Sequence, residues 1–139
     1  MEGKISHTAQ IRVRYADTDK MGFVYYANYL VFFEVGRTEF IRRYYKPYSD
    51  IEASGYVLPA LSADVEYIRS AYYDDLLDIE TVLEEQKGVR IKFYYEVKRA
   101  GELLARGHTT HVFTNKKGKP VKVPRELRER FKDLRGKIC

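Results

Sequence analysis

The residue types best suited to catalysis gather in one run, Tyr15–Tyr29 (YADTDKMGFVYYANY). Two carboxylates, Asp17 and Asp19, lie there just ahead of a segment with helical periodicity. The first turn of a helix offers backbone N–H groups without acceptors, and its dipole favours negative charge. Acyl transfer needs a carboxylate that attacks or activates water, and fixed N–H donors that stabilise an oxyanion. This run could supply both, with Asp17 or Asp19 as the carboxylate and the amide region of Tyr26 as the donor.

The same carboxylates also have a structural explanation. Asp-Thr-Asp in front of a helix is typical of an Asx-turn or an N-cap, in which the side chains bond to nearby backbone amides. Residue spacing alone therefore leaves catalysis and turn formation open for Asp17 and Asp19.

The segments on either side of this run predict a strand and a long helix. Thr8–Tyr15 alternates apolar with basic residues, which is the period of a half-buried strand whose inner face includes Tyr15. Tyr26–Tyr45 carries apolar residues at i, i+3 and i+4 spacing, which is typical of a helix with one buried stripe. Pro47 then ends the helix, because the residue before a proline resists helical geometry.

The remainder of the chain predicts antiparallel strands and a terminal helix. Turns at Lys87-Gly88 and Ala100-Gly101 separate alternating segments, as in hairpins, and Pro124 suits the first position of a short helix. The expected strands are Leu61–Arg69, Leu76–Glu85, Val89–Lys98 and Leu103–Thr114. This order predicts one α+β domain over residues 1–139, in which an antiparallel sheet wraps the long central helix.

Length and composition exclude several classes of protein. A chain of 139 residues is too short for a doubly wound dinucleotide-binding fold with a second domain. The single cysteine, Cys139, excludes an intrachain disulfide framework and a cysteine-based zinc site, and with only three histidines we expect no structural metal. No apolar stretch is long enough to cross a membrane and Met1–Gln10 has no signal-peptide core, so we expect a cytoplasmic protein.

Two further pairs have plain structural expectations. Glu34 and Arg37 are three residues apart on the expected helix; they could lie near an interface or the site, and an ion pair between them is the plainer expectation. His108 and His111 are three residues apart on an expected strand, so their side chains should point to opposite faces. A metal site shared by the two histidines is therefore not expected.

The run Arg14–Arg42 (RYADTDKMGFVYYANYLVFFEVGRTEFIR) resembles the signature of hotdog-fold acyl-CoA thioesterases. It is most similar to the 4-hydroxybenzoyl-CoA thioesterase family, including its Tol–Pal-associated bacterial members. A second run, Tyr67–Thr81 (YIRSAYYDDLLDIET), resembles the family's strand–turn–strand with its Asp-Asp pair. The resemblance spans nearly the whole chain. It implies a single-layer hotdog fold that forms a homodimer or homotetramer, with sheets joined edge to edge and active sites at the subunit interface.

The resemblance assigns roles to three residues of the first run. Asp19 matches the family's catalytic carboxylate, acting as nucleophile or as general base on water. Tyr26 matches the residue whose backbone N–H polarises the thioester carbonyl, and Gly22 allows the turn that aims this amide. Tyr25 is placed among the substrate-binding residues. Because a thioester is already an activated acyl group, no metal or redox cofactor is expected.

The chain departs from the family pattern at two positions. Many members of the Tol–Pal branch carry histidine where this chain has Tyr26, and tyrosine is seen there in the hydroxybenzoyl branch. A backbone N–H role survives this change, whereas a side-chain role for imidazole does not. Ser70 stands where proline is common before the Asp-Asp turn.

The segment from Asn115 onward carries the surplus of positive charge. Its ten basic minus three acidic side chains give +7, in a chain whose net charge is +5. Coenzyme A carries a pyrophosphate and a 3′-phosphate, which Lys and Arg bind by charge and hydrogen bonding. An acidic acyl carrier protein could dock on the same tail, and a solvated surface is the plainer alternative. The candidate phosphate contacts are Lys116, Lys117, Lys119 and Lys122.

The sequence therefore predicts an acyl-CoA thioesterase that releases a free carboxylic acid and coenzyme A. Two alternatives stay open: hydrolysis of acyl-carrier-protein thioesters, and a non-catalytic binder that holds RNA or an acidic protein through the basic tail. RNA is the less favoured partner, because Phe131 is the one aromatic residue of the tail. A hotdog dehydratase is disfavoured, because none of the three histidines lies near the start of the long helix.

Overall fold

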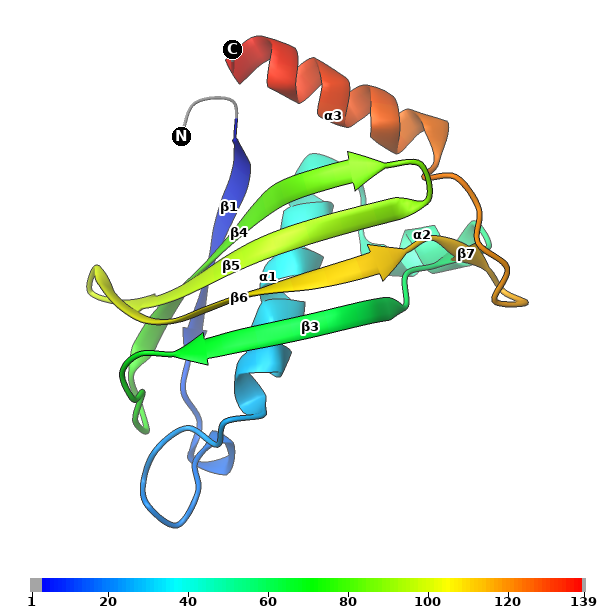
Figure 1. Ribbon diagram of the computed structural model, residues 1–139. Helices are drawn as coiled ribbons and strands as arrows, with labels where there is room; N and C mark the ends of the chain where they lie inside the picture. The colour runs from blue at the N-terminus through cyan, green and yellow to red at the C-terminus, as the bar shows by residue number, and fades with distance from the viewer. Residues whose placement is uncertain (1–3, 139) are drawn as a thin grey trace.

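The computed structural model describes residues 4–138, so Cys139 lies outside the described range. The elements are β1 (Ile5–Arg12), η1 (Tyr15–Asp17), α1 (Asn28–Tyr44), α2 (Tyr48–Ala53), β2 (Tyr56–Val57), β3 (Ala60–Tyr67), β4 (Leu76–Lys87), β5 (Arg90–Arg99), β6 (Glu102–Val112), β7 (Thr114–Asn115) and α3 (Arg125–Ile138). Five strands form one antiparallel sheet in the order β1-β4-β5-β6-β3, and α1 lies against one face of it (Figure 1). This arrangement confirms the predicted α+β fold.

The core lies between α1 and the inner face of the sheet. Phe33 and Phe40 of α1 are fully buried, and the ring of Phe33 stacks on Tyr95 of β5 with centroids 4.3 Å apart. Gly36 allows the helix to approach β4 closely, since a Cβ at this position would lie 2.9 Å from Cγ2 of Ile79. Burial of these aromatic rings holds the helix to the sheet.

Strand β3 forms one edge of the sheet and is open to solvent. It pairs with β6 on one side only, and every residue of β3 except Val65 is exposed. Leu61 and Tyr67, which the sequence alternation places on one face, are 53% and 48% exposed. The sequence of β3 therefore has the alternation expected for a half-buried strand, but its apolar face is largely uncovered within this chain.

The start of the chain differs from the expected strand. Strand β1 ends at Arg12, and Tyr15 lies in η1 with 79% of its surface exposed, so its placement on an inner face was wrong. The chain leaves the sheet because Asp17 accepts a hydrogen bond from the Arg14 N–H and closes a tight turn. The short helix α2 and the β2–β7 ribbon were not predicted.

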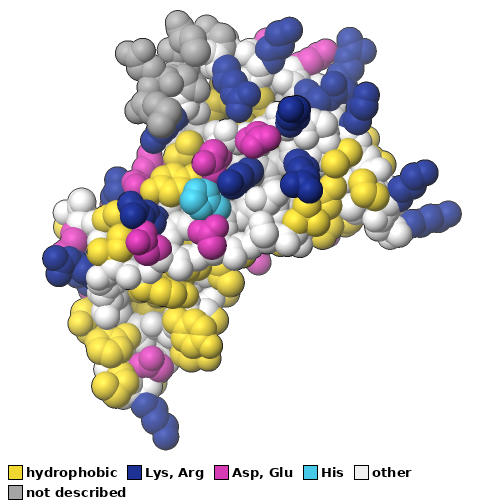
Figure 2. Space-filling view, viewed as in Figure 1, with side chains coloured by type: hydrophobic (Ala, Val, Ile, Leu, Met, Phe, Trp, Pro, Cys, Tyr) yellow, Lys and Arg dark blue, Asp and Glu magenta, His cyan; other side chains and the backbone are white. Residues whose placement is uncertain are grey.

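The outer face of the sheet is polar. Figure 2 shows acidic and basic side chains interspersed around one histidine on this face. His108 Nδ1 lies 3.1 Å from Asp64 Oδ1, whereas His111 is fully buried, so the two histidines point to opposite faces as predicted. Among residues 4–138, no helix is both long enough and apolar enough to cross a membrane.

Candidate active site

Asp17 is a structural carboxylate. Its side chain is buried and accepts hydrogen bonds from the Arg14 backbone N–H at 2.8 Å and from Arg14 Nη2 at 2.9 Å. Its backbone carbonyl accepts from the Tyr25 N–H and from Asn28 Nδ2, both at 2.9 Å. Burial acts to raise the pKa of Asp17, but the hydrogen bonds and charge of Arg14 outweigh burial and lower the pKa. Asp17 is therefore an ionised anchor that ties the loop to the start of α1.

Asp19 is exposed and only partly engaged by its own loop. Its Oδ1 accepts the Met21 N–H at 2.8 Å, and its backbone carbonyl accepts the Gly22 N–H at 3.0 Å. Gly22 has φ +85°, a conformation that glycine adopts without strain. Within the described residues no group donates a hydrogen bond to Asp19 Oδ2. One carboxylate oxygen thus shapes the turn, and the other is free to act on a ligand.

The turn before α1 presents backbone amides in fixed orientations. The Asn28 N–H bonds to the Tyr25 carbonyl at 2.9 Å and so fixes the peptide that carries the Tyr26 N–H. The Tyr67 hydroxyl donates to the Tyr26 carbonyl at 2.9 Å and fixes the following peptide, which carries the Ala27 N–H. From residue 4 to residue 138, neither the Tyr26 nor the Ala27 N–H finds an acceptor. Both are oriented donors at the positive end of the helix dipole.

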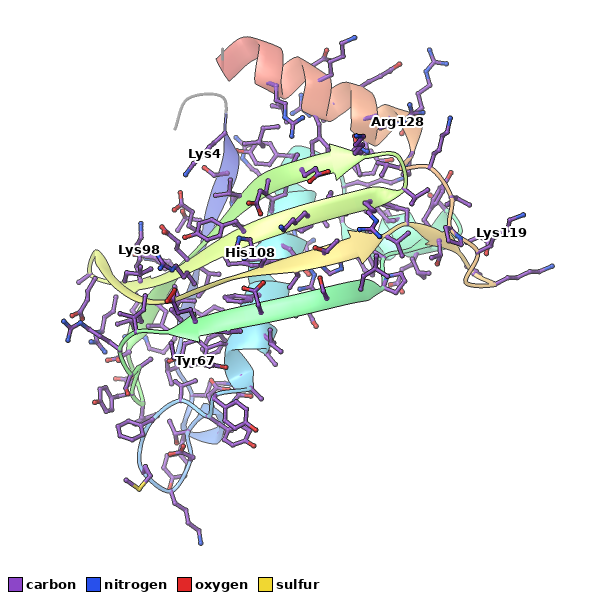
Figure 3. The ribbon with its side chains drawn as sticks, in the orientation of Figure 1. Lys4, Tyr67, Lys98, His108, Lys119 and Arg128 are labelled. Carbon is purple, nitrogen blue, oxygen red and sulfur yellow. The ribbon has the colours of Figure 1, made fainter. Side chains whose placement is uncertain are left out.

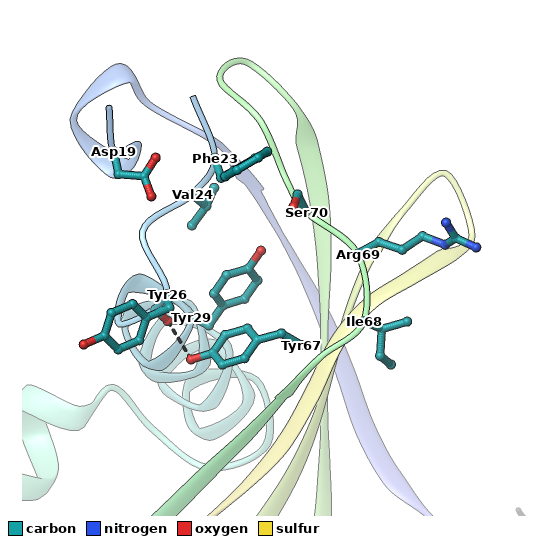
Figure 4. A pocket seen from close by; sticks show the side chains of 9 residues that line it. All are labelled: Asp19, Phe23, Val24, Tyr26, Tyr29, Tyr67, Ile68, Arg69 and Ser70. Carbon is teal, nitrogen blue, oxygen red and sulfur yellow. Dashed lines mark hydrogen bonds between the residues drawn. The ribbon is translucent and has the colours of Figure 1, made fainter. Parts of the chain in front are cut away.

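Asp19 and Tyr26 line one pocket of about 290 Å³ (Figure 4). The ring of Tyr67, at the end of β3, meets Tyr29 of α1 edge-on with centroids 5.2 Å apart. Burial raises the pKa of both phenols, so each keeps its proton at neutral pH and can donate a hydrogen bond. The other lining residues are Phe23, Val24, Ile68, Arg69 and Ser70.

The loop after β3, which contributes Ser70 to the pocket, is held in place by an ion pair that lies outside the pocket. Asp75 Oδ2 accepts the Tyr72 N–H at 2.9 Å and lies 2.7 Å from Nη1 of Arg99 on β5. The Ala71 carbonyl in this loop accepts the Val24 N–H at 2.9 Å. The loop after β3 and the loop before α1 are therefore linked, and the position of Asp19 depends on both.

Several lining residues were not foreseen from the sequence. Tyr29 and Tyr67 come from segments distant in the chain, and the one available signal was that Tyr67 ends an alternating strand beside the Asp-Asp turn. Tyr25, predicted to bind substrate, does not line this pocket; its ring packs 4.7 Å from that of Tyr26 and is partly exposed.

The predicted phosphate-binding lysines lie elsewhere in the chain. Three of them follow β7 in a turn closed by Asn115 Oδ1, which accepts two backbone N–H groups at 2.9 and 3.0 Å, and Lys122 lies between this turn and α3. Figure 3 shows Lys119 at the opposite end of the sheet from Tyr67. None of the four lines the pocket of Asp19, so their contact with coenzyme A stays a prediction. These lysines are Lys116, Lys117, Lys119 and Lys122.

Comparison with known proteins identifies the family. The profile of the thioesterase-like superfamily matches residues 13–131. The putative acyl-CoA thioesterase YneP of Bacillus subtilis (strain 168) is 36% identical, over 89% of this chain and 88% of its own length. The acyl-CoA thioesterase YbgC of Haemophilus influenzae (strain ATCC 51907 / DSM 11121 / KW20 / Rd) is 34% identical, over 90% and 93%.

A solved structure supports the same assignment. A mutant 4-hydroxybenzoyl-CoA thioesterase in complex with 4-hydroxybenzoyl-CoA is 26% identical and superposes with a TM-score of 0.82, over 91% of this chain and 98% of that one. The predicted family and hotdog fold are confirmed. With a profile match over most of its length and relatives above 30% identity, this chain belongs to the thioesterase-like superfamily of hotdog-fold thioester hydrolases.

Proposed function

We propose that the protein is an acyl-CoA thioesterase, which hydrolyses an acyl-CoA to a free carboxylic acid and coenzyme A. The observation that carries this proposal is the meeting of Asp19, with one free carboxylate oxygen, and the unbonded Tyr26 N–H in one pocket. A carboxylate facing a carbonyl held by a fixed N–H donor suits acyl transfer. The names of the YneP and YbgC relatives support a coenzyme A thioester as the substrate.

In the proposed reaction the thioester oxygen accepts a hydrogen bond from the Tyr26 N–H, and the carbonyl carbon faces Asp19. Asp19 either attacks this carbon, forming a mixed anhydride and releasing the coenzyme A thiolate, after which water cleaves the anhydride and releases the free acid, or it takes a proton from the water that attacks. Negative charge develops on the carbonyl oxygen in both routes, and the amide and the helix dipole stabilise it. Single turnover in isotopically labelled water separates the routes, because only the anhydride route puts label into the Asp19 carboxylate.

We also propose that the working unit is a homodimer joined through β3, or a homotetramer built from such dimers. The free edge of β3, its two exposed faces and its exposed Leu61 and Tyr67 support this assembly. An exposed strand edge with apolar side chains is a template for pairing with another chain. The pocket wall includes Tyr67 and Ile68 at the end of β3, so a second copy paired there would adjoin the site.

The basic tail is proposed to contact an acidic ligand. In α3, Phe131 is 2% exposed, so it is not free to stack on a nucleic-acid base. This favours the coenzyme A phosphates or an acidic acyl carrier protein over RNA. If Lys116, Lys117, Lys119 and Lys122 bind these phosphates while Asp19 attacks the thioester, they act from a different part of the surface or from the second copy.

A thiol-release assay on the purified full chain tests the function. The substrates are short aliphatic, long aliphatic and aromatic acyl-CoAs, and the same acyl groups on acyl carrier protein. We expect catalytic release of thiol from at least one acyl-CoA class. Release from carrier-protein thioesters alone would favour the second candidate, and release from neither set would contradict thioesterase activity.

A further inference from the structure

Two Glu–Arg pairs with the same i, i+3 spacing lie on α1, and only one is closed within the chain. Glu39 Oε2 lies 3.1 Å from Arg42 Nε. Glu34 and Arg37 were predicted to pair in the same way, but no ion pair joins them in the described part of the chain, so that prediction was wrong. Both line a cavity of about 260 Å³ between α1 and the segment that contains Tyr48 and Leu58.

The polar groups behind Arg37 are already satisfied by one another. His111 Nδ1 lies 3.2 Å from the Leu58 carbonyl, to which it must donate, so its Nε2 accepts from the Thr109 hydroxyl at 2.8 Å. The Thr109 oxygen in turn shares a hydrogen bond with the Tyr95 hydroxyl. Burial and the positive charge of Arg37 lower the pKa of His111 to about 4, so the imidazole is neutral at physiological pH.

Arg37 is therefore a half-buried cation whose polar neighbour within the chain is the neutral Tyr95 hydroxyl, with no carboxylate bound to it among residues 4–138. A charge that is partly removed from water is costly unless an opposite charge compensates for it. The cavity beside Arg37 has room for a carboxylate from outside the chain. On the rim of the same cavity, Glu34 is an exposed carboxylate that itself lacks an ion-pair partner among the described residues.

We propose that Glu34 of a second copy binds Arg37, and that Arg37 of the second copy receives Glu34 of the first. Twofold symmetry makes such a contact reciprocal, because if residue i contacts j then j contacts i. The adjoining surface of α1 is apolar and exposed, with Leu30, Val31 and Val35 at 40%, 50% and 36%. The inference rests on the proposed homodimer and names the contact that aligns its two central helices.

The contact matters for the site because of where α1 begins. Helix α1 passes behind β3 and starts directly after the Tyr26 turn (Figure 1). Two reciprocal ion pairs between the helices would fix how far each slides along the other. Charge pairs at interfaces of this kind set orientation and partner choice more than they set affinity. The register of the two helices would then fix the position of each Asp19 pocket relative to the other subunit.

Charge reversal tests the pair. In a homodimer of Glu34→Arg each of the two contacts brings two cations together, and in a homodimer of Arg37→Glu each contact brings two carboxylates together. We expect each variant alone to weaken dimerisation by about 100-fold or more, since like charges in contact cost several kcal/mol. Mixing the two variants should restore a heterodimer, because both contacts then join opposite charges. Sedimentation equilibrium gives the dissociation constants, and native mass spectrometry of differently tagged chains identifies the heterodimer.

The ion pair between Glu39 and Arg42 on the same helix gives a matched control. Glu39→Arg and Arg42→Glu break an intrachain contact of the same type, so we expect each to leave the dissociation constant within about twofold, and mixing them to have no effect. If Arg37→Glu does not fold by circular dichroism, Glu34→Gln replaces the test, with an expected weakening of about tenfold. An unchanged constant in Glu34→Gln would overturn the pair.

The outcomes separate this inference from the function. Folded variants that stay monomeric after mixing, while the wild type dimerises and releases thiol, would overturn the Glu34–Arg37 contact alone. A wild type that releases thiol as a monomer would overturn the contact and the dimer but leave the thioesterase proposal standing. Restored heterodimers support the contact whatever the acyl specificity is.

Discussion

Strands β5 and β3 belong to the same sheet and have similar alternating sequences, but only one of them is covered. Along β5, buried residues such as Phe93, Tyr95 and Val97 alternate with half-buried ones under α1. Along β3, Leu61 and Tyr67 stay exposed. Alternating apolar residues suit a strand that is covered on one face. In a single chain, the apolar face of β3 is left largely uncovered. The central strands therefore stabilise the chain, whereas the β3 side carries the pocket and the proposed contact with a second copy.

The largest effect on stability is expected where α1 packs on the central strand β5. Phe33 is fully buried and stacks on Tyr95, so Phe33→Ala should lower the free energy of unfolding by about 3–5 kcal/mol. Leu61→Ala truncates an exposed apolar side chain on β3 and should cost less than about 0.5 kcal/mol in the dissociated chain. Urea unfolding at a protein concentration below the dimer dissociation constant measures both. Equal losses would show that the buried contact between α1 and β5 and the exposed strand β3 do not differ in this way.

The buried imidazole of His111 on β6 predicts a loss of stability in acid. His111 takes up a proton near pH 6.5 in the unfolded chain but only near pH 4 in the folded one. Below pH 6.5 the unfolded state therefore binds more protons, and the free energy of unfolding falls by roughly 3 kcal/mol by pH 4 through this group. His111→Asn should remove this part of the slope and His108→Gln should not. An unchanged slope in His111→Asn would contradict the burial argument.

The smallest effect is expected on the outer face of β3. Glu66 pairs with Arg106, and both side chains are largely exposed, at 59% and 47%. Glu66→Gln should lower stability by less than about 1 kcal/mol, and the difference should shrink in 1 M salt because exposed charges are screened. Thermal unfolding at low and high salt measures it. A loss well above this range at both salt concentrations would mean that this face is covered in the assembled protein.

Local patterns were enough to predict most of the fold. The expected helix at residues 26–45 corresponds to α1 at Asn28–Tyr44, and both hairpin turns contain a glycine with positive φ, 62° at Gly88 and 84° at Gly101. The β2–β7 ribbon was missed because Tyr56 pairs with Asn115, a contact between distant segments that leaves no periodic signal. Tyr15 was misplaced because alternation continues past Arg12, where turn hydrogen bonds end the strand.

The site was less predictable than the fold. Spacing treats Asp17 and Asp19 alike, and the preference for Asp19 came from family resemblance. What distinguishes them is that Arg14 engages both oxygens of Asp17, a contact that depends on the shape of the turn. Helix geometry predicted an ion pair between Glu34 and Arg37. In the structure the two side chains line a cavity and form no ion pair with each other. The lysines after β7 do not line the pocket of Asp19.

The most direct test of the account compares two carboxylates of one loop, using kcat for thiol release and the free energy of unfolding. Asp19→Asn should lower kcat by about 100-fold or more and leave stability within about 0.5 kcal/mol, because Asp19 is exposed and acts on the substrate. Asp17→Asn should cost about 1–3 kcal/mol of stability, because it weakens buried charged hydrogen bonds, and should change kcat less than tenfold. Near-normal turnover by Asp19→Asn would contradict the central claim.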